Sequence, residues 1–359
     1  MYLKNISLHN FKNYLHYNTD FVAHFNLICG LNGVGKTNLL DAIYYLSFGK
    51  SAFVSDNALA KWESSFFRVE GNFLRQDEPI EIVVKWVNNQ RKEIIKNGLS
   101  YDRFSEHVGE LPLSLIAPND IDMVQGGGEN RRKLMDMHLS QIEPDYLQAL
   151  LRYNRALLQR NTMLKQYQDV PKVDLNLLQA YDFELHQQAH IIFEKRKTLS
   201  AEIVPLVNDF YAQLSQGRED IGIRYSSALT NRQLLDILVY NLPYDRQMAR
   251  TTEGTHRDDW ELELKGMSLK KFGSQGQQKS FVLALKLALA QYVSQKKGIK
   301  PLLLLDDIFD KLDNLRIEAL IELVQAHFSQ VFITDTQPER LTSLFKQKKI
   351  DFKLIHLEE

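Results

Sequence analysis

The feature that most constrains this chain is a glycine-rich segment between two apolar runs near its N-terminus. Residues 30–37 read Gly-Leu-Asn-Gly-Val-Gly-Lys-Thr and match the pattern G-x-x-x-x-G-K-[ST] at every fixed position. The preceding "FNLICG" predicts a buried strand. The following "NLLDAIYYLSFG" has apolar residues at helical spacing, and Gly49 is suited to cap the helix. Strand, loop and helix in this order predict a phosphate-binding loop in an α/β domain.

Each residue type in this loop has a chemical reason. Glycines let backbone N–H groups converge on phosphate oxygens, and the helix N-terminus adds partial positive charge. We expect Lys36 to meet the β- and γ-phosphates of ATP and the Thr37 hydroxyl to ligate Mg²⁺. A glycine-rich turn that merely ends a strand is the alternative, and the complete match disfavours it. The predicted ATP-binding residues here are Gly30, Leu31, Asn32, Gly33, Val34, Gly35, Lys36 and Thr37.

A pair of acidic residues follows a second apolar run. "PLLLLDD" predicts a buried parallel strand with Asp306 and Asp307 at its carboxyl end, where open α/β sheets bind ligands. We expect Asp306 to hold the magnesium ion and Asp307 to polarise an attacking water. With Lys36 they form the predicted catalytic set. Two adjacent acids after a strand can also be a solvated turn, and the phosphate loop makes that reading less favoured.

The segment "FGSQGQQKS" precedes a strongly apolar helix that ends at Gly298. Ser274 and Gln277 fit a capping box, so the serine can simply start a helix. Ser274, Gly276 and the exposed N–H groups can also form a second anion site. Phosphate loop, serine-glycine segment and acidic strand in this order are typical of ABC-type ATPases, in which one subunit completes the nucleotide site of another. Both interpretations stay open.

More chain lies between the loop and the acidic strand than one α/β unit needs. Residues 54–105 alternate apolar and polar positions between turn pairs, which predicts an antiparallel β region. Helical periodicity follows. Leucines 147, 150, 151, 158 and 164 predict one helix, apolar positions 178–192 a second, and residues 201–215 a third that is kinked or started near Pro205. We therefore predict an ATPase domain at residues 1–112 and 250–359 and an inserted helical domain at 113–249.

Composition and charge narrow the class of protein. A single cysteine rules out an intrachain disulfide and fits a reducing compartment, and no run reaches the length of a membrane helix. The chain is expected to be cytoplasmic and without membrane contact.

The net charge of -1 hides a local surplus, since residues 131–165 contain seven Lys or Arg against three Asp or Glu. These cations predict salt-sensitive, sequence-independent contacts with DNA phosphates, with a solvated helix face as the alternative. The candidates for DNA contact are Arg131, Arg132, Lys133, Arg152, Arg155 and Arg160.

Taken together, these motifs resemble the RecF family of bacterial recombination mediators, whose ATPase head is similar to those of SMC proteins. The resemblance covers nearly the whole length. The segments that carry it, beside the phosphate loop, are "FKNY", "APNDIDMVQGGGENRRKLMD", "LLQRNTMLK", "GTHRDD", "GSQGQQK", "LLLLDD" and "QVFITDT". It implies an α/β P-loop NTPase of the ABC/SMC-head type with an antiparallel β subdomain and an inserted helical domain.

The resemblance also implies roles for single residues. Lys12 and Asn13 are expected near the nucleotide. Ser274, Gln275 and Gly276 are expected to reach the γ-phosphate held by a partner copy. Asp313, in "DKLD", is expected in the loop that couples the two sites of a dimer.

Three positions depart from the ABC pattern. Asp307 stands where many ABC ATPases have glutamate, and we hypothesise slow turnover. Residues 334–336 (Thr-Asp-Thr) stand where many such ATPases have a histidine, and residues 118–120 (Pro-Asn-Asp) stand where they often have a glutamine.

His256, Arg257 and Asp258 can have a bracing role or a catalytic role, and both interpretations stay open.

The function implied by the resemblance is an ATP-dependent homodimer on DNA that acts at stalled forks or gaps, recruits RecR and supports RecA loading. Two alternatives remain at this point. One is a short SMC-like head with another DNA-maintenance role. The other is a phosphate-loop kinase, which predicts an acceptor pocket and activity as a monomer.

Overall fold

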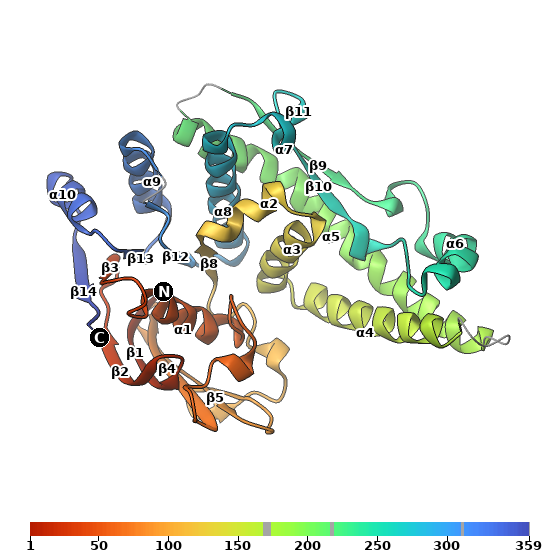
Figure 1. The fold of residues 1–359 in the computed structure, drawn as a ribbon, viewed down its shortest axis with the longest axis horizontal. Helices are drawn as coiled ribbons and strands as arrows, with labels where there is room; N and C mark the ends of the chain where they lie inside the picture. Colours follow the sequence, from red (N-terminus) through yellow and green to blue (C-terminus); the bar gives the residue numbers. More distant parts are fainter. Residues whose placement is uncertain (168–173, 216–218, 310–311, 359) are drawn as a thin grey trace. The chain divides into compact units, whose positions relative to one another are not determined.

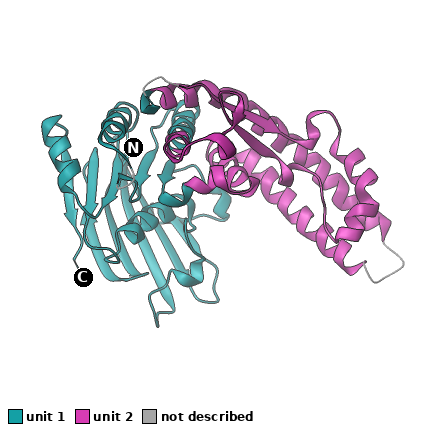
Figure 2. Cartoon of the chain, turned by 45° about the horizontal axis from the view of Figure 1, so that its top comes forward, with its two compact units in different colours: residues 1–120, 213–217, 283–359 teal, residues 121–212, 218–282 magenta. Residues whose placement is uncertain are grey.

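The computed structural model describes residues 1–167, 174–215, 219–309 and 312–358 (Figure 1). The chain divides into two compact units, which Figure 2 distinguishes by colour. Unit 1 comprises residues 1–120, 213–217 and 283–359, and unit 2 comprises residues 121–212 and 218–282.

A five-stranded parallel sheet forms the centre of unit 1. Its strands, in spatial order, are β14 (Phe352–His356), β3 (Phe25–Cys29), β13 (Val331–Asp335), β12 (Leu302–Leu305) and β8 (Leu113–Ile116). Every residue of β3, β8, β12 and β13 is buried, as expected for parallel strands covered on both faces. Because all five strands run the same way, the segments that follow β3, β13 and β12 meet at one carboxyl edge.

The predicted strand, loop and helix at the start of unit 1 are confirmed. Helix α1 (Lys36–Phe48) begins directly after the glycine loop, and Gly49 ends it in the left-handed conformation with its N–H bonded to the Tyr45 carbonyl. Helix α8 (Gln275–Lys297) ends at Gly298, as expected. Helices α9 (Asn314–His327) and α10 (Glu339–Gln347) complete the unit.

A six-stranded antiparallel sheet also belongs to unit 1. Its strands, in spatial order, are β2 (Tyr14–Asp20), β1 (Tyr2–Phe11), β4 (Phe66–Arg75), β5 (Glu78–Val87), β6 (Glu93–Lys96) and β7 (Leu99–Ser100). The predicted antiparallel region is confirmed and larger than expected, because the N-terminal strands β1 and β2 join it. Asn97 and Gly98 both have positive φ angles between β6 and β7, which suits the predicted Asn-Gly turn.

Unit 2 is helical with a small antiparallel sheet. Its longer helices are α3 (Gly128–Ile142), α4 (Pro144–Gln166), α5 (Leu175–Ser215) and α6 (Leu234–Met248). Its sheet has the order β11 (Met267–Ser268), β10 (Asp259–Leu264), β9 (Ile221–Ser226), and the short helices are α2 (Asp122–Gln125) and α7 (Leu269–Phe272). Helix α3 packs against α4 and β10.

One expectation for the helices was wrong. The second and third predicted helices are one helix, α5, of 41 residues, with Pro205 inside it. The first predicted helix is confirmed as α4, in which Leu151 and Leu158 are 50% and 68% exposed. The face that packs inward carries Tyr146, Ala149, Tyr153, Ala156, Arg160 and Met163. Leu164 is also buried, but most residues of this stripe are not leucine, so leucine spacing alone does not locate it.

The compact units do not coincide with the sequence-based boundaries at residues 113 and 250. Strand β8 pairs with β12 and so belongs to unit 1, whereas β10 pairs with β9 and keeps residues 250–282 in unit 2. The inserted domain at 113–249 stays a prediction. Within the described residues, no helix combines the length and apolarity needed to cross a membrane.

Candidate functional site

The glycine loop leaves β3 at the carboxyl edge of the parallel sheet. Gly30 and Gly35 have φ angles of 152° and 115°, in the region that side chains disfavour. A Cβ on Gly30 would lie 2.6 Å from the Leu357 carbonyl oxygen, and one on Gly35 would lie 2.6 Å from the Asn13 amide nitrogen. Both positions therefore require glycine, for conformation and for space.

Lys36 turns its ammonium back onto this loop. Its Nζ donates to the carbonyl oxygens of Gly30 at 2.7 Å and Leu31 at 3.0 Å, and the residue is only 7% exposed. Among the described residues, Lys36 forms no ion pair. Its positive charge is met by backbone dipoles alone, which leaves it suited to an anionic ligand.

Thr37 and Asp306 lie together although they are far apart in the sequence. The Thr37 hydroxyl donates to the Asp306 carboxylate, at 2.9 Å to Oδ1 and 3.1 Å to Oδ2. Burial raises the pKa of Asp306, and hydrogen bonds from Thr334 and Thr37 oppose that rise. Magnesium is commonly held by one or two carboxylates together with substrate phosphates and water. The hydroxyl and carboxylate here fit such an ion, and Thr37 and Asp306 are the residues that would hold it.

Thr334 is a residue of this site to which the sequence assigned no contact. It is the penultimate residue of β13, which lies between β3 and β12, and its buried hydroxyl donates to Asp306 Oδ1 at 2.8 Å. The same hydroxyl accepts the Asp307 N–H at 2.9 Å. Asp307 has a φ angle of 47°, an uncommon conformation for aspartate that clusters at functional sites. The sequence signal for Thr334 is a polar residue at the carboxyl end of a buried strand.

Lys12 and Asn13, which link β1 to β2, contact the loop and α1. Asn13 donates its amide N–H to the Val34 carbonyl at 3.0 Å and accepts from Asn38 at 2.8 Å. Lys12 forms an ion pair with Asp41 at 2.7 Å. Asn13 therefore braces the loop, whereas the Lys12 charge is already neutralised within unit 1.

The segment after β8 is tied to α8 by a buried ion pair. Asp120 accepts the Ala117 N–H at 2.7 Å and pairs with Lys286, whose Nζ also donates to the Leu115 carbonyl. Burial lowers the pKa of Lys286, and Asp120 opposes that fall. These contacts hold residues 118–120, which stand where many ABC ATPases have a glutamine, against α8.

Ser274 begins α8 in the way the capping interpretation predicted. The Ser274 N–H donates to Gln277 Oε1 at 2.6 Å, and the Gln277 N–H donates to Ser274 Oγ at 3.3 Å. The capping box is confirmed, and Ser274 and Gln275 are exposed. The second anion site at Ser274, Gln275 and Gly276 stays a prediction.

Asp313, the other residue expected at a dimer contact, caps α9. Its carboxylate accepts the Arg316 N–H at 2.9 Å. The first two residues of "DKLD", Asp310 and Lys311, lie outside the described residues. The coupling role of Asp313 stays a prediction.

Two of the six cations predicted to contact DNA are not available to it. Arg160 is 0% exposed and pairs with Asp182 at 2.6 Å and Asp245 at 2.7 Å. Arg131 is buried and grips both oxygens of Asp259, at 2.6 and 2.8 Å. Their charges are neutralised inside unit 2, so we remove both from the DNA set.

The other four cations reach the surface of unit 2. Arg152 and Arg155 are exposed on α4. Lys133 forms an exposed pair with Glu129 one helical turn away, the kind of pair that contributes little to stability. Arg132 is partly buried. These four residues remain candidates for DNA contact.

The "HRDD" segment has structural contacts inside unit 2. His256 accepts from the Tyr153 hydroxyl at 2.8 Å through Nδ1 and donates to the Thr251 carbonyl at 3.1 Å through Nε2. Burial lowers the pKa of His256 to about 4, which agrees with a neutral ring. Asp258 pairs with Arg196 at 3.0 Å. These contacts favour the bracing interpretation of the segment.

The chain matches the family model described as the RecF/RecN/SMC N terminal domain over residues 2–353. A curated relative, the DNA replication and repair protein RecF of Flavobacterium johnsoniae, is 40% identical over 362 residues. The match covers 99% of this chain and 100% of that protein.

Solved structures give the same result for the fold. A structure of the recombination mediator protein RecF with ATP has a TM-score of 0.86 and 31% identity, covering 94% of this chain and 92% of that one. An Smc head, at 18% identity and a TM-score of 0.56, shares the fold alone. By sequence and by fold, this chain belongs to the RecF family of the RecF/RecN/SMC group.

Proposed function

We propose that this protein is an ATP-controlled DNA-binding protein of replication and recombinational repair. The observation that carries the proposal is Lys36, a buried cation at the mouth of the glycine loop whose only described partners are two backbone carbonyls. The RecF relatives add support, since one is named a DNA replication and repair protein and another was solved with ATP. Because bacterial DNA lies in the cytoplasm, the proposal locates the protein there.

In the proposed site, the loop N–H groups and Lys36 bind the phosphates, and Thr37 and Asp306 hold a magnesium ion. The ion would offset charge on the phosphates. Asp307 orients the attacking water, and the Thr334 hydroxyl positions both aspartates through its hydrogen bonds to Asp306 and to the Asp307 N–H. Aspartate is one methylene shorter than the glutamate of many ABC ATPases, so slow hydrolysis is expected. ATP binding and hydrolysis therefore switch the protein between two states and do not drive rapid turnover.

The switch works through a second copy of the chain. Ser274, Gln275 and Gly276 of one copy are proposed to contact the γ-phosphate held by Lys36 of its partner. A nucleotide that binds the dimer better than the monomer shifts the population to the dimer. Hydrolysis removes the bridging phosphate and reverses the shift.

The DNA contacts are proposed at Arg132, Lys133, Arg152 and Arg155, which meet backbone phosphates without reading sequence. At gapped DNA or at junctions of duplex and single strand, the dimer is proposed to recruit RecR and to support RecA loading. A pull-down with RecR in ATP and in ADP tests the partner directly. Equal capture of RecR by the wild type and by a variant that binds no ATP would contradict nucleotide control.

Sedimentation with ATP or ADP tests the dimer. The wild type should dimerise with ATP but not with ADP. Lys36→Arg and Ser274→Arg should stay monomeric with either nucleotide. Gln277→Ala is the matched control for Ser274→Arg, because it breaks the same capping box and leaves the serine in place. If Ser274→Arg dimerises like the control, the shared site is wrong. A phosphate-loop kinase would instead bind ATP and act as a monomer in every variant that retains Lys36.

A further inference from the structure

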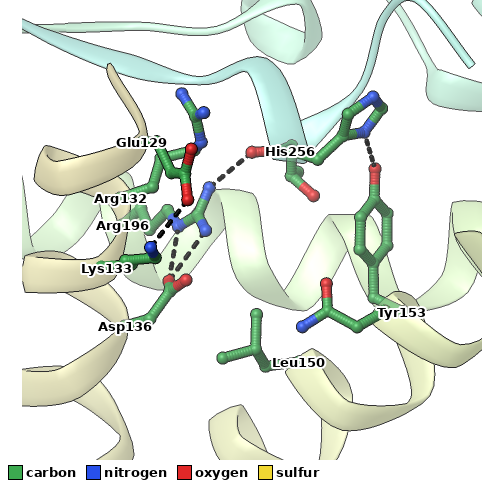
Figure 3. A pocket seen from close by; sticks show the side chains of 10 residues that line it. Glu129, Arg132, Lys133, Asp136, Leu150, Tyr153, Arg196 and His256 are labelled. Carbon is green, nitrogen blue, oxygen red and sulfur yellow. Dashed lines mark hydrogen bonds and ion pairs between the residues drawn. The ribbon is translucent and has the colours of Figure 1, made fainter. Parts of the chain in front are cut away.

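Four chain segments that are distant in sequence line one cavity of unit 2 (Figure 3). They are the start of α3 with "RRKLMD", the middle of α4, Arg196 of α5, and "GTHRDD". The cavity has a volume of about 230 Å³. The first and last of these segments helped to distinguish the RecF family in the sequence, yet the ATP site in unit 1 uses neither. The ATP site therefore does not explain why these two segments meet at this cavity.

The floor of the cavity is fixed by satisfied polar contacts. Arg196 lies between Asp136, at 2.8 Å, and the Thr255 carbonyl, at 2.7 Å (Figure 3). On the other side the Tyr153 hydroxyl points at the His256 ring (Figure 3). These side chains are engaged with one another, so the shape of the cavity is already formed.

One cation of the cavity lacks a carboxylate partner. Arg132 donates a single N–H, from Nη1, to the Asp258 carbonyl at 2.7 Å, and it forms no ion pair within the part of the chain that the structure describes. Burial and the nearby guanidinium groups of Arg196 and Arg257 lower the pKa of Arg132, and the carboxylates of Asp259 and Asp258 oppose that fall. Arg132 therefore has both cations and carboxylates near it, and its guanidinium keeps N–H groups that no described carboxylate accepts.

Two further donors stand at the rim. Lys133 is 71% exposed, and its pair with Glu129 is equally exposed, so water screens it. Asn154, exposed on α4, can turn its amide N–H groups toward the cavity. A planar guanidinium with an ammonium and an amide beside it is a donor set suited to a tetrahedral oxyanion.

We propose that this cavity binds one phosphate group, with Arg132 as its main ligand and Lys133 and Asn154 at its rim. The phosphate has two possible sources, a free anion or the backbone of a nucleic acid. The site shares Arg132 and Lys133 with the proposed DNA contacts and is independent of the ATP site.

Calorimetric titration of the full chain with inorganic phosphate tests the site, with chloride at the same ionic strength as the reference. The wild type should bind phosphate in the millimolar range or tighter. Arg132→Gln should weaken binding about tenfold or more, because a charged hydrogen bond is lost. Asn154→Asp, at an exposed position where folding is not at risk, should weaken binding comparably by adding negative charge at the rim.

Two controls separate this site from others. Arg246→Gln removes an exposed arginine of unit 2 away from the cavity and should bind phosphate like the wild type. Lys36→Met removes the phosphate loop's cation and should leave the cavity's binding intact. ATP binding measured on Arg132→Gln should be unchanged, so failure of this site and failure of the ATP site give different results.

The source of the phosphate follows from competition with a short DNA duplex. If DNA displaces phosphate from the wild type, the nucleic-acid backbone is the source, and if it does not, the ligand is a free anion. Both results support the cavity as a phosphate site. Absence of phosphate binding, or equal binding by Asn154→Asp, Arg132→Gln and Arg246→Gln, would overturn it.

Discussion

Lys36 and Arg160 are both buried cations, and their surroundings differ in one decisive way. Among the residues that the structure describes, Lys36 of unit 1 meets only the carbonyl oxygens of Gly30 and Leu31. Arg160, in unit 2, meets the carboxylates of Asp182 and Asp245. A buried charge needs compensation, which a fixed carboxylate gives permanently and a backbone dipole gives only in part. The lysine can accept an anionic ligand, whereas the arginine holds the fold together.

This contrast predicts that the two cations respond oppositely to removal. In unit 2 the loss should appear in stability, and in unit 1 it should appear in ligand binding.

Arg160→Met should destabilise the protein by about 3–5 kcal/mol, because it leaves two buried carboxylates without their partner. Chemical unfolding measures the change. Arg155→Met is the matched control, since Arg155 is an exposed arginine on the same helix, and it should change stability by no more than about 0.5 kcal/mol. Similar values for the two variants would mean that the buried pairs contribute nothing special.

Acid should destabilise unit 2 through His256. Its pKa in the folded state is lowered from 6.5 to about 4, so between these values the unfolded chain binds the proton more readily. Stability is therefore lost as the pH falls through this window, by at most about 3 kcal/mol. Unfolding of the wild type and of His256→Gln at several pH values measures it. The stability of the variant should fall less steeply with pH than that of the wild type. Parallel curves would mean that His256 does not cause this loss of stability.

Lys36→Met should weaken ATP binding by about 1.5–3 kcal/mol, since charge-assisted hydrogen bonds to phosphate are lost. Stability without nucleotide should change by less than about 1 kcal/mol, because no carboxylate is left unpaired. Calorimetry and unfolding on the same preparation measure both. A large loss of stability with unchanged affinity would reverse the assignment of Lys36.

Thr334→Val should cost about 1–2 kcal/mol of stability, because the Asp307 N–H and Asp306 lose a buried partner. It should also lower kcat more than it raises the KM for ATP, since the phosphate loop is untouched. Thr334→Ser keeps the hydroxyl and should restore the rate. If valine and serine behave alike, the hydroxyl does not position the aspartates.

Much of unit 1 could be predicted because its signals are contiguous. The loop from Gly30 to Thr37 specifies its own turn, and the four leucines before Asp306 specify a buried parallel strand. The contribution of β1 and β2 to the antiparallel sheet could not be predicted, since pairing of β1 with β4 is set by contacts between distant segments. In unit 2, leucine spacing indicated helices but not their buried faces, because Tyr146, Tyr153 and Arg160 occupy the inner stripe of α4.

The same limit applies to the sites. Thr37 and Asp306 were predicted because each belongs to a recognisable motif, and the structure brings them within 2.9 Å. The contacts of Thr334 were missed because they depend on β13 lying between β3 and β12. Arg131 and Arg160 were misjudged because charge along a sequence does not reveal carboxylates that arrive from elsewhere, such as Asp259 and Asp245.

If one ATP is held by Lys36 of one copy and Ser274 of another, two variants that each lack one of these residues should complement each other when they are mixed. In the presence of ATP, neither Lys36→Met nor Ser274→Arg should dimerise by itself. A mixture of the two should form dimers in ATP, because one site of the mixed pair combines an intact Lys36 with an intact Ser274. If the mixture sediments as monomers while the wild type dimerises under the same conditions, the shared site is contradicted.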